Sequence, residues 1–225
     1  MSRDAFLDRV RKAALAGTAH RIERKPLPPE AGYVGAEGDL CERFAAEVVS
    51  VGGVAHLVES PGAAGAVLES LVAGSSVSQA LCWRHELLER VGVDERLEAR
   101  GIERCDYLAL APLPPSEQRQ RMLACQIGIT SCDLAIAETG SLVMFSGAGR
   151  ERVASLLPPV HVAVVERGQI VPDLLDAIAS LSRRNRGRLP SNVVLITGPS
   201  KTGDIELQLT TGVHGPGVWH VIVIR

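Results

Sequence analysis

The sequence predicts an α/β protein with a mostly parallel, twisted sheet and helices on both of its faces. Three observations predict this class. Short apolar runs alternate with stretches of helical periodicity through most of the chain, as in proteins built from βαβ crossovers. The composition is 46% hydrophobic but only 3% aromatic, so Val, Leu, Ile and Ala must fill the core, which suits a sheet buried on both faces. At 225 residues the chain is long enough for one sizeable domain.

The first 38 residues are expected to form a separate segment before that domain. Apolar residues at helical spacing predict an amphipathic helix over residues 3–16, which ends at Gly17. The stretch that follows, KPLPPEAGYVGAEG, is rich in proline and glycine and predicts an extended arm. We therefore divide the chain into a helix and arm at residues 1–38 and a single α/β domain at residues 39–225.

The α/β domain alternates between helical and strand-like patterns. Helical periodicity occurs at residues 40–51, 63–73, 85–101 and 116–126, and in a segment opened by Pro172. Apolar runs lie at residues 54–58, 76–82, 160–166, 192–197 and 219–224, and on either side of residues 138–140. Because ligands of parallel sheets bind beyond the carboxyl ends of the strands, the site is expected in the loops after residues 137, 146, 197 and 211.

Composition and charge exclude several partners and cofactors. The formal net charge of −2 gives no general attraction to nucleic acid. No apolar run approaches the roughly 20 residues that span a bilayer. The amphipathic N-terminus carries acidic residues, unlike a signal peptide, so we expect a cytoplasmic protein. Five cysteines without a C-x-x-C pair predict that this chain holds no iron–sulfur cluster or zinc site of its own. No other cofactor is predicted for it.

A glycine-rich turn near the C-terminus has the spacing of a phosphate loop. Gly198 and Gly203 fit the Walker A spacing, but residues 204–205 lack the lysine and hydroxyl that must follow, which excludes a nucleotide triphosphatase. A strand end followed by the hydroxyls and ammonium of residues 200–202, and by a helix starting near Asp204, would offer several donors to an anion. The alternative is that a hydroxyl of this turn only caps that helix.

Two further residues are candidates for proton transfer. Glu138 lies at a strand end between apolar runs, where the pKa of a carboxyl group tends to rise; it could act as a general acid or base, or bond nearby donors as a turn residue. His214 lies among glycines and could reach a ligand, a metal ion or a proton, or make hydrogen bonds within its loop. Asp204 and Glu206 could form a carboxylate–histidine group with His214, but only if their loops lie close together in the fold. The histidines that lie within strands are interpreted as structural: His56, His161 and His220.

Three stretches, in this order, resemble a known family. They are GITSCDLAIAETGSLV, ERVASLLPPVHVAVVERGQIVPDLLDAI and GPSKTGDIELQLTTGVHGPG. Over about residues 125–225 they are similar to the lactate-utilisation protein C family (LutC/YkgG, LUD domain). The resemblance implies a fold like that of the NagB/RpiA/CoA-transferase group. It also implies a role in bacterial L-lactate use, in which the protein acts with two iron–sulfur partners in oxidising lactate to pyruvate, and the partners hold the clusters.

The family motifs cover the candidate residues. Glu138 and His214 are the candidate catalytic residues. The candidate residues for binding a small organic anion such as lactate are Thr139, Gly140, Gly198, Ser200, Lys201, Thr202, Asp204 and Glu206, and no metal ligand is assigned. Gly203 departs from the alanine expected at its position. The chain could form a homo-oligomer. Two other functions remain as alternatives: a non-catalytic metabolite-binding assembly or regulatory module, and a CoA or acyl transferase with Glu138 as its nucleophile.

Overall fold

The computed structural model describes residues 2–18, 35–74, 76–184, 190–203, 209–212 and 214–225. The chain separates into two compact units, Met1–Val34 and Gly35–Arg225. In the first unit, helix α1 (Arg3–Thr18) confirms the helix predicted at the N-terminus. Its apolar residues Phe6, Val10 and Leu15 are exposed. None of the described helices is both long enough and apolar enough to cross a membrane.

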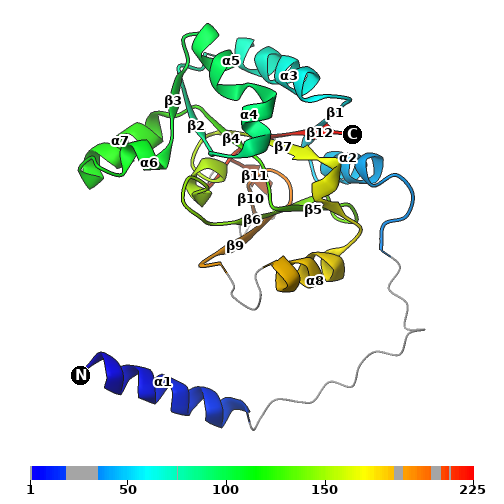
Figure 1. Cartoon of the computed structure of the whole chain (residues 1–225). Helices are drawn as coiled ribbons and strands as arrows, with labels where there is room; N and C mark the ends of the chain where they lie inside the picture. The colour runs from blue at the N-terminus through cyan, green and yellow to red at the C-terminus, as the bar shows by residue number, and fades with distance from the viewer. Residues whose placement is uncertain (1, 19–34, 75, 185–189, 204–208, 213) are drawn as a thin grey trace. The chain divides into compact units, whose positions relative to one another are not determined.

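The second unit is built on a six-stranded parallel sheet with the strand order β1-β12-β7-β4-β2-β3 (Figure 1). The strands are β1 (Val54–Val58), β2 (Gln79–Cys82), β3 (Glu103–Cys105), β4 (Ile127–Thr130), β7 (Val160–Glu166) and β12 (Val218–Ile224). Residues 162–165 of β7 and 221–224 of β12 are buried. Such continuous apolar runs are typical of strands covered on both faces, and they form the centre of the core.

A smaller mixed sheet was not predicted. It has the order β8-β5-β6-β9, in which β5 is parallel to β8 and β6 is antiparallel to β5 and β9. Its strands are β5 (Leu134–Ile136), β6 (Ser141–Phe145), β8 (Ile170–Val171) and β9 (Val193–Ile196), and a separate antiparallel pair joins β10 (Lys201–Gly203) to β11 (Leu209–Thr211). The predicted parallel α/β sheet is confirmed, but it is accompanied by this second sheet, because the short runs around residues 137–140 pair as a hairpin.

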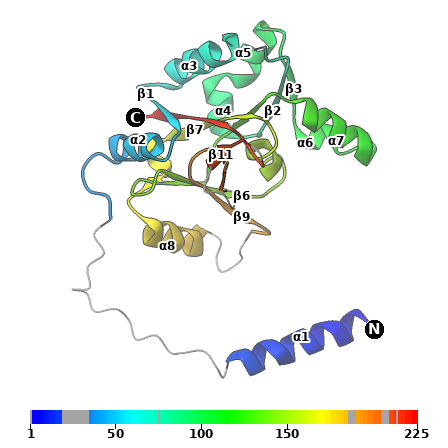
Figure 2. The ribbon, with the colours of Figure 1, turned by 180° about the vertical axis from the view of Figure 1, so that it is seen from behind.

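The helices lie on both sides of the parallel sheet, but unequally. They are α2 (Leu40–Ser50), α3 (Pro61–Ala73), α4 (Glu86–Val91), α5 (Val93–Ala99), α6 (Tyr107–Leu110), α7 (Pro115–Ala124) and α8 (Leu174–Arg184), with 3₁₀ turns η1 (Arg152–Ser155) and η2 (Arg167–Gln169). Figures 1 and 2 show α3, α4 and α5 on one side of the parallel sheet, and the mixed sheet with α8 on the other. The prediction that helices cover both faces is therefore only partly correct. The second face is covered by the mixed sheet as well as by helices.

Short-range signals set the helix boundaries. Asp39 caps α2, because its carboxylate accepts hydrogen bonds from the N–H groups of Cys41 and Glu42. Before α8 the cap is Asp173, whose carboxylate accepts from the Asp176 N–H, so Pro172 lies just outside the helix that it was expected to open. The Pro172 carbonyl instead accepts the N–H groups of Ala36 and Glu138.

The hairpin turn between β5 and β6 packs tightly against α2. Gly140 in this turn has a left-handed backbone with φ +63°. A Cβ at this position would lie 2.6 Å from the Val48 nitrogen and 2.7 Å from the carbonyl carbon of Glu47. Gly140, which the family motif placed among the binding residues, is therefore required by the contact between the hairpin and α2.

We expect Gly140→Ala to lower the free energy of unfolding more than Gly101→Ala does. Both glycines are left-handed, with φ +63° and +66°, and a residue with a Cβ costs about 1–2 kcal/mol in that conformation. Only Gly140 adds a clash, because nothing lies within 4 Å of a Cβ at Gly101. Urea denaturation of both variants measures the difference. Equal losses would show that α2 moves away from the turn at little cost.

Candidate functional site

A cavity of about 240 Å³ lies where the C-terminal motif loops meet the parallel sheet. It is bordered by the carboxyl end of β9 and by the amino ends of β7 and β12. Its lining consists of Ser155, Leu156, His161, residues 194–200, residues 214–216 and Trp219. The loops expected after residues 197 and 211 do contribute. The cavity nevertheless lies at the amino edge of the parallel strands, because β9 belongs to the mixed sheet and approaches from the other side.

Backbone hydrogen bonds hold the two glycine-rich loops together. The Ser200 N–H donates to the Pro216 carbonyl at 2.8 Å, and the Gly212 N–H donates to the Ser200 carbonyl at 2.9 Å. Gly198 has φ +84°, and a Cβ there would lie 2.7 Å from the Val51 carbonyl oxygen. This close approach requires glycine. The structure thus brings Gly198, Ser200 and His214 to one cavity, where His214 is exposed at the surface.

The Glu138 turn is joined to this region by a chain of hydroxyl groups. The Thr139 hydroxyl lies 2.7 Å from that of Ser141, which lies 2.7 Å from that of Thr197. The chain connects the start of β6 to the residue that follows β9, next to the cavity. Glu138 itself is half-buried and does not line the cavity. The hydroxyls of the motif therefore contact the cavity region, whereas its carboxylate does not.

Lys201 and Thr202 occupy a strand rather than the approach to a helix. Residues 201–203 form β10, which pairs with β11, where the sequence predicted a turn before a helix. The Lys201 ammonium donates to the Val51 carbonyl at 2.8 Å, near the end of α2. Neither Lys201 nor Thr202 lines the cavity. Asp204 and Glu206, and the helix predicted to start near residue 204, lie outside the described residues.

Two buried residues form an inner wall of the cavity that the sequence analysis did not assign. His161 and Trp219 are opposite each other in the β7–β12 pairing, and both are almost fully buried. The His161 Nε2 lies 2.9 Å from the Thr130 hydroxyl, and burial lowers the pKa of this imidazole to about 3. The buried contact with Thr130 fits the interpretation of His161 as a structural residue. His161 also lines the cavity.

The pattern within the strands explains how these residues were missed. Side chains alternate along a strand, so Trp219 and His220 point to opposite faces of the sheet. His220 lies with His56, 3.2 Å between Nδ1 and Nε2, and burial lowers the pKa of both imidazoles. Alternation within one strand does not show whether His161 shares a face with histidines of other strands. Only the pairing of β7 with β12 places it beside Trp219.

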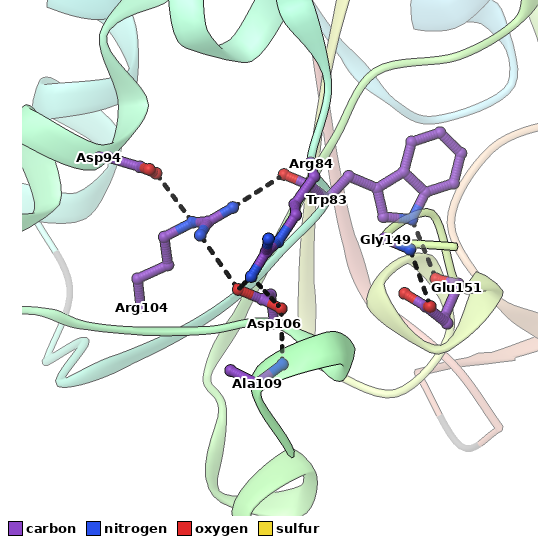
Figure 3. A network of polar contacts seen from close by, with 8 residues as sticks. All are labelled: Trp83, Arg84, Asp94, Arg104, Asp106, Ala109, Gly149 and Glu151. Carbon is purple, nitrogen blue, oxygen red and sulfur yellow. Dashed lines mark hydrogen bonds and ion pairs between the residues drawn. The ribbon is translucent and has the colours of Figure 1, made fainter. Parts of the chain in front are cut away.

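A separate polar network occupies the carboxyl ends of β2 and β3 (Figure 3). Arg84 donates to both oxygens of Asp106 at 3.0 and 3.2 Å, and Arg104 donates to one of them at 3.2 Å. The Ala109 N–H donates to the same carboxylate at 2.9 Å. Burial alone would raise the pKa of Asp106, but the hydrogen bonds from Arg84 and Ala109 hold it below its usual range.

The loop after residue 146 belongs to this network and not to the cavity. The indole N–H of Trp83 donates to the Glu151 carbonyl, and the Gly149 N–H donates to the Glu151 carboxylate. A second cavity of about 290 Å³ lies beside the network, and Arg84, Arg104 and Asp94 contribute to its lining. Both arginines are already paired with carboxylates, so the network serves mainly to join β2, β3 and this loop.

We expect Asp106→Asn to destabilise the fold by about 1.5–3 kcal/mol at pH 7, because it removes the buried carboxylate that accepts hydrogen bonds from Arg84, Arg104 and the Ala109 N–H. Asp94→Asn is the matched control. Asp94 pairs with the same Arg104, but its side chain is 60% exposed, so the loss should be within about 1 kcal/mol. Urea denaturation of the two variants measures both losses.

The same carboxylate predicts a pH dependence. The pKa of Asp106 is lower in the folded than in the unfolded chain, so its contribution is fully present above about pH 4 and is lost as pH falls further. Unfolding measured between pH 5 and pH 2.5 should therefore show a smaller acid-induced loss for Asp106→Asn than for the unchanged protein. Parallel curves would contradict this role.

All five cysteines are buried free thiols. Cys125 and Cys132, the two that lie nearest in sequence, are both fully enclosed in the core. Within the described ranges, no group of three or more His, Cys, Asp or Glu side chains has an arrangement that could hold a metal ion.

Comparison with known proteins assigns this arrangement to a family. Three similar proteins are lactate utilization protein C of Geobacillus sp. (strain WCH70), 44% identical over 92 residues; lactate utilization protein C of Halalkalibacterium halodurans, 30% over 151 residues; and the uncharacterized protein YkgG of Escherichia coli K12, 32% over 131 residues. These matches cover 40%, 66% and 57% of this chain. They span 38%, 64% and 55% of the length of those relatives.

A solved structure supports the fold. The crystal structure of a DUF162 family protein from Deinococcus radiodurans aligns with a TM-score of 0.56 at 20% identity, covering 83% of this chain and 96% of that one. The family model described as the LUD domain matches residues 41–224, which include both sheets and every residue of the cavity. The chain therefore belongs to the LUD domain family.

Proposed function

We propose that this chain is a component of a bacterial L-lactate utilisation system that oxidises L-lactate to pyruvate together with iron–sulfur partner proteins. We further propose that its cavity holds the small organic anion. The observation that carries the proposal is family membership: the LUD domain spans residues 41–224, and similar proteins are named lactate utilization protein C. The stretches that resemble that family also supply the cavity walls, at Ser155, Gly198 and His214 among others.

The dimensions of the cavity support a small ligand. Its volume of about 240 Å³ is below the ~300 Å³ at which pockets for drug-sized ligands begin. Ser200 and His214 offer polar groups, and Leu156 and Pro216 offer apolar surface. A three-carbon hydroxy acid such as lactate matches these two kinds of surface: its carboxylate and hydroxyl suit the polar groups, and its methyl group suits the apolar surface. The described lining contains no carboxylate side chain, so nothing in it repels such an anion.

The proposal assigns proton transfer to His214. This histidine is exposed and lines the cavity, so it can exchange protons with water and reach the bound acid. Glu138 was an equal candidate from the sequence, but it stands outside the cavity lining. Oxidation of a 2-hydroxy acid to a 2-oxo acid also releases two electrons. We assign these electrons to clusters on the iron–sulfur partner proteins, because this chain has no C-x-x-C pair from which to build a cluster site.

Deletion of the gene tests the role directly. In a strain without another L-lactate dehydrogenase, we expect growth on L-lactate as the sole carbon source to be lost, and growth on pyruvate to continue. Reintroduction of the unchanged gene should restore growth, which excludes an effect on neighbouring genes. Unimpaired growth of the deletion strain on L-lactate would refute the lactate role.

A non-catalytic metabolite-binding or regulatory module is the alternative of another class. Reconstitution with the two iron–sulfur partners and an artificial electron acceptor separates the two functions. The proposal expects L-lactate-dependent reduction that falls at least tenfold in His214→Ala, in line with the contribution of a general acid or base. His56→Ala, on the opposite face of the sheet, is the control and should retain activity. Lactate binding without turnover in the complete assembly would favour the regulatory module.

A further inference from the structure

We propose that Trp219 is a ligand-binding residue of the cavity, where its indole N–H donates to an oxygen of a small 2-hydroxy acid. This inference rests on the proposed function, since it names the residue and the ligand chemistry of the same site. It starts from one atom. Trp219 is 2% exposed, and among the described residues its Nε1 has no hydrogen-bond partner. An indole N–H can only donate, and a buried donor without a partner costs free energy.

Gly53 sets the position of the six-membered ring of the indole. The atoms Cε3 and Cζ3 of Trp219 face Gly53, where a Cβ would lie 2.5 and 3.0 Å from them. The Nε1 atom is on the opposite edge of the indole, and Trp219 lines the cavity. Gly53 therefore gives the six-membered ring room to pack against the α2–β1 turn, and we infer that the opposite, N–H edge faces the cavity.

The neighbouring groups add a second, complementary contact. Ser155 is buried in the same lining, and its hydroxyl donates to the Arg152 carbonyl at 2.9 Å. A hydroxyl has one hydrogen, so the oxygen of Ser155 remains able to accept a hydrogen bond. His161, opposite Trp219, is held by Thr130 and is neutral at physiological pH because burial lowers its pKa.

This pairing of a donor with an acceptor selects the ligand class. A carboxylate oxygen accepts from Trp219, and a hydroxyl on the adjacent carbon donates to Ser155. A 2-oxo acid offers only acceptors, so it leaves the Ser155 oxygen without a donor, and propionate lacks the second oxygen altogether. Among short monocarboxylates, we therefore expect L-lactate to bind more tightly than pyruvate or propionate.

Calorimetric titration with L-lactate tests the role of Trp219. Trp219→Phe keeps the ring but removes the N–H, and it should raise Kd by roughly ten- to a hundredfold, as for loss of a hydrogen bond to a charged group. Trp83→Phe is the matched control, because the Trp83 N–H donates to the Glu151 carbonyl away from the cavity. It should bind L-lactate as the unchanged protein does. A Kd for Trp219→Phe within twofold of the unchanged protein overturns the inference.

A second measurement does not require the Trp219 variant to fold. The chain has two tryptophans, so Trp83→Phe leaves Trp219 as the sole source of indole fluorescence. Saturating L-lactate should shift or quench that emission, and equal concentrations of propionate should not reproduce the effect. An unchanged emission spectrum, or no binding of L-lactate up to millimolar concentrations, also overturns the inference.

The two proposals fail separately. Loss of growth on L-lactate without binding at Trp219 would leave the lactate role standing and remove the Trp219 site. Binding that depends on Trp219, combined with unimpaired growth of the deletion strain, would retain the site and remove the physiological role. Equal affinities for L-lactate and pyruvate would contradict the acceptor assigned to Ser155.

Discussion

Strands β7 and β12 pair in parallel over seven residues, from Val160 opposite Val218 to Glu166 opposite Ile224. Their central residues are completely buried, so this pairing lies in the middle of the hydrophobic core and is held by burial on both faces. A shift of one residue would turn the side chains of one strand to the other face. The cavity depends on this register, because it places His161 beside Trp219 on one face and leaves His220 with His56 on the other.

The mixed sheet contributes the second side of the site. Its strand β9 ends at Ile196, and the hydroxyl of the next residue, Thr197, is hydrogen bonded to Ser141 at the start of β6. Gly140 and Gly198 both approach the backbone at the end of α2 too closely for any other residue. These contacts align the hairpin turn, the glycine-rich loop and α2 with one another. A cavity between two sheets is thus defined by backbone positions that only glycine can occupy.

The character of the cavity bears on how a LUD domain could act in lactate oxidation. Its described lining has no carboxylate, lysine or arginine side chain and contains apolar surface, the buried hydroxyl of Ser155 and an indole, with an exposed histidine at the surface. The proposed recognition of a small molecule rests on donors and acceptors at these positions. The charged groups are concentrated elsewhere, at the carboxyl ends of β2 and β3, where arginines and carboxylates compensate each other. The proposed substrate recognition by this chain is compatible with the proposed electron transfer by partner proteins.

The sequence by itself determined the local structure. Apolar periodicity and apolar runs predicted α2, β1, β7 and β12 nearly to the residue, because these segments have strong hydrophobic patterns. Composition indicated the buried parallel sheet, and the motif stretches indicated the family. The proximity of Gly198, Ser200 and His214 could be expected from those stretches.

Only the tertiary structure decided which strand edge forms the site and which residues complete it. The antiparallel pairing of β5, β6 and β9 makes a second sheet, because hydrogen bonding between distant strands does not follow from the pattern within each strand. Lys201 has the chemistry of an anion ligand, yet the fold directs its ammonium to the carbonyl of Val51. Trp219 has the sequence context of a core residue, and it lies at the cavity because β7 lies beside β12 and Gly53 leaves room for the indole ring.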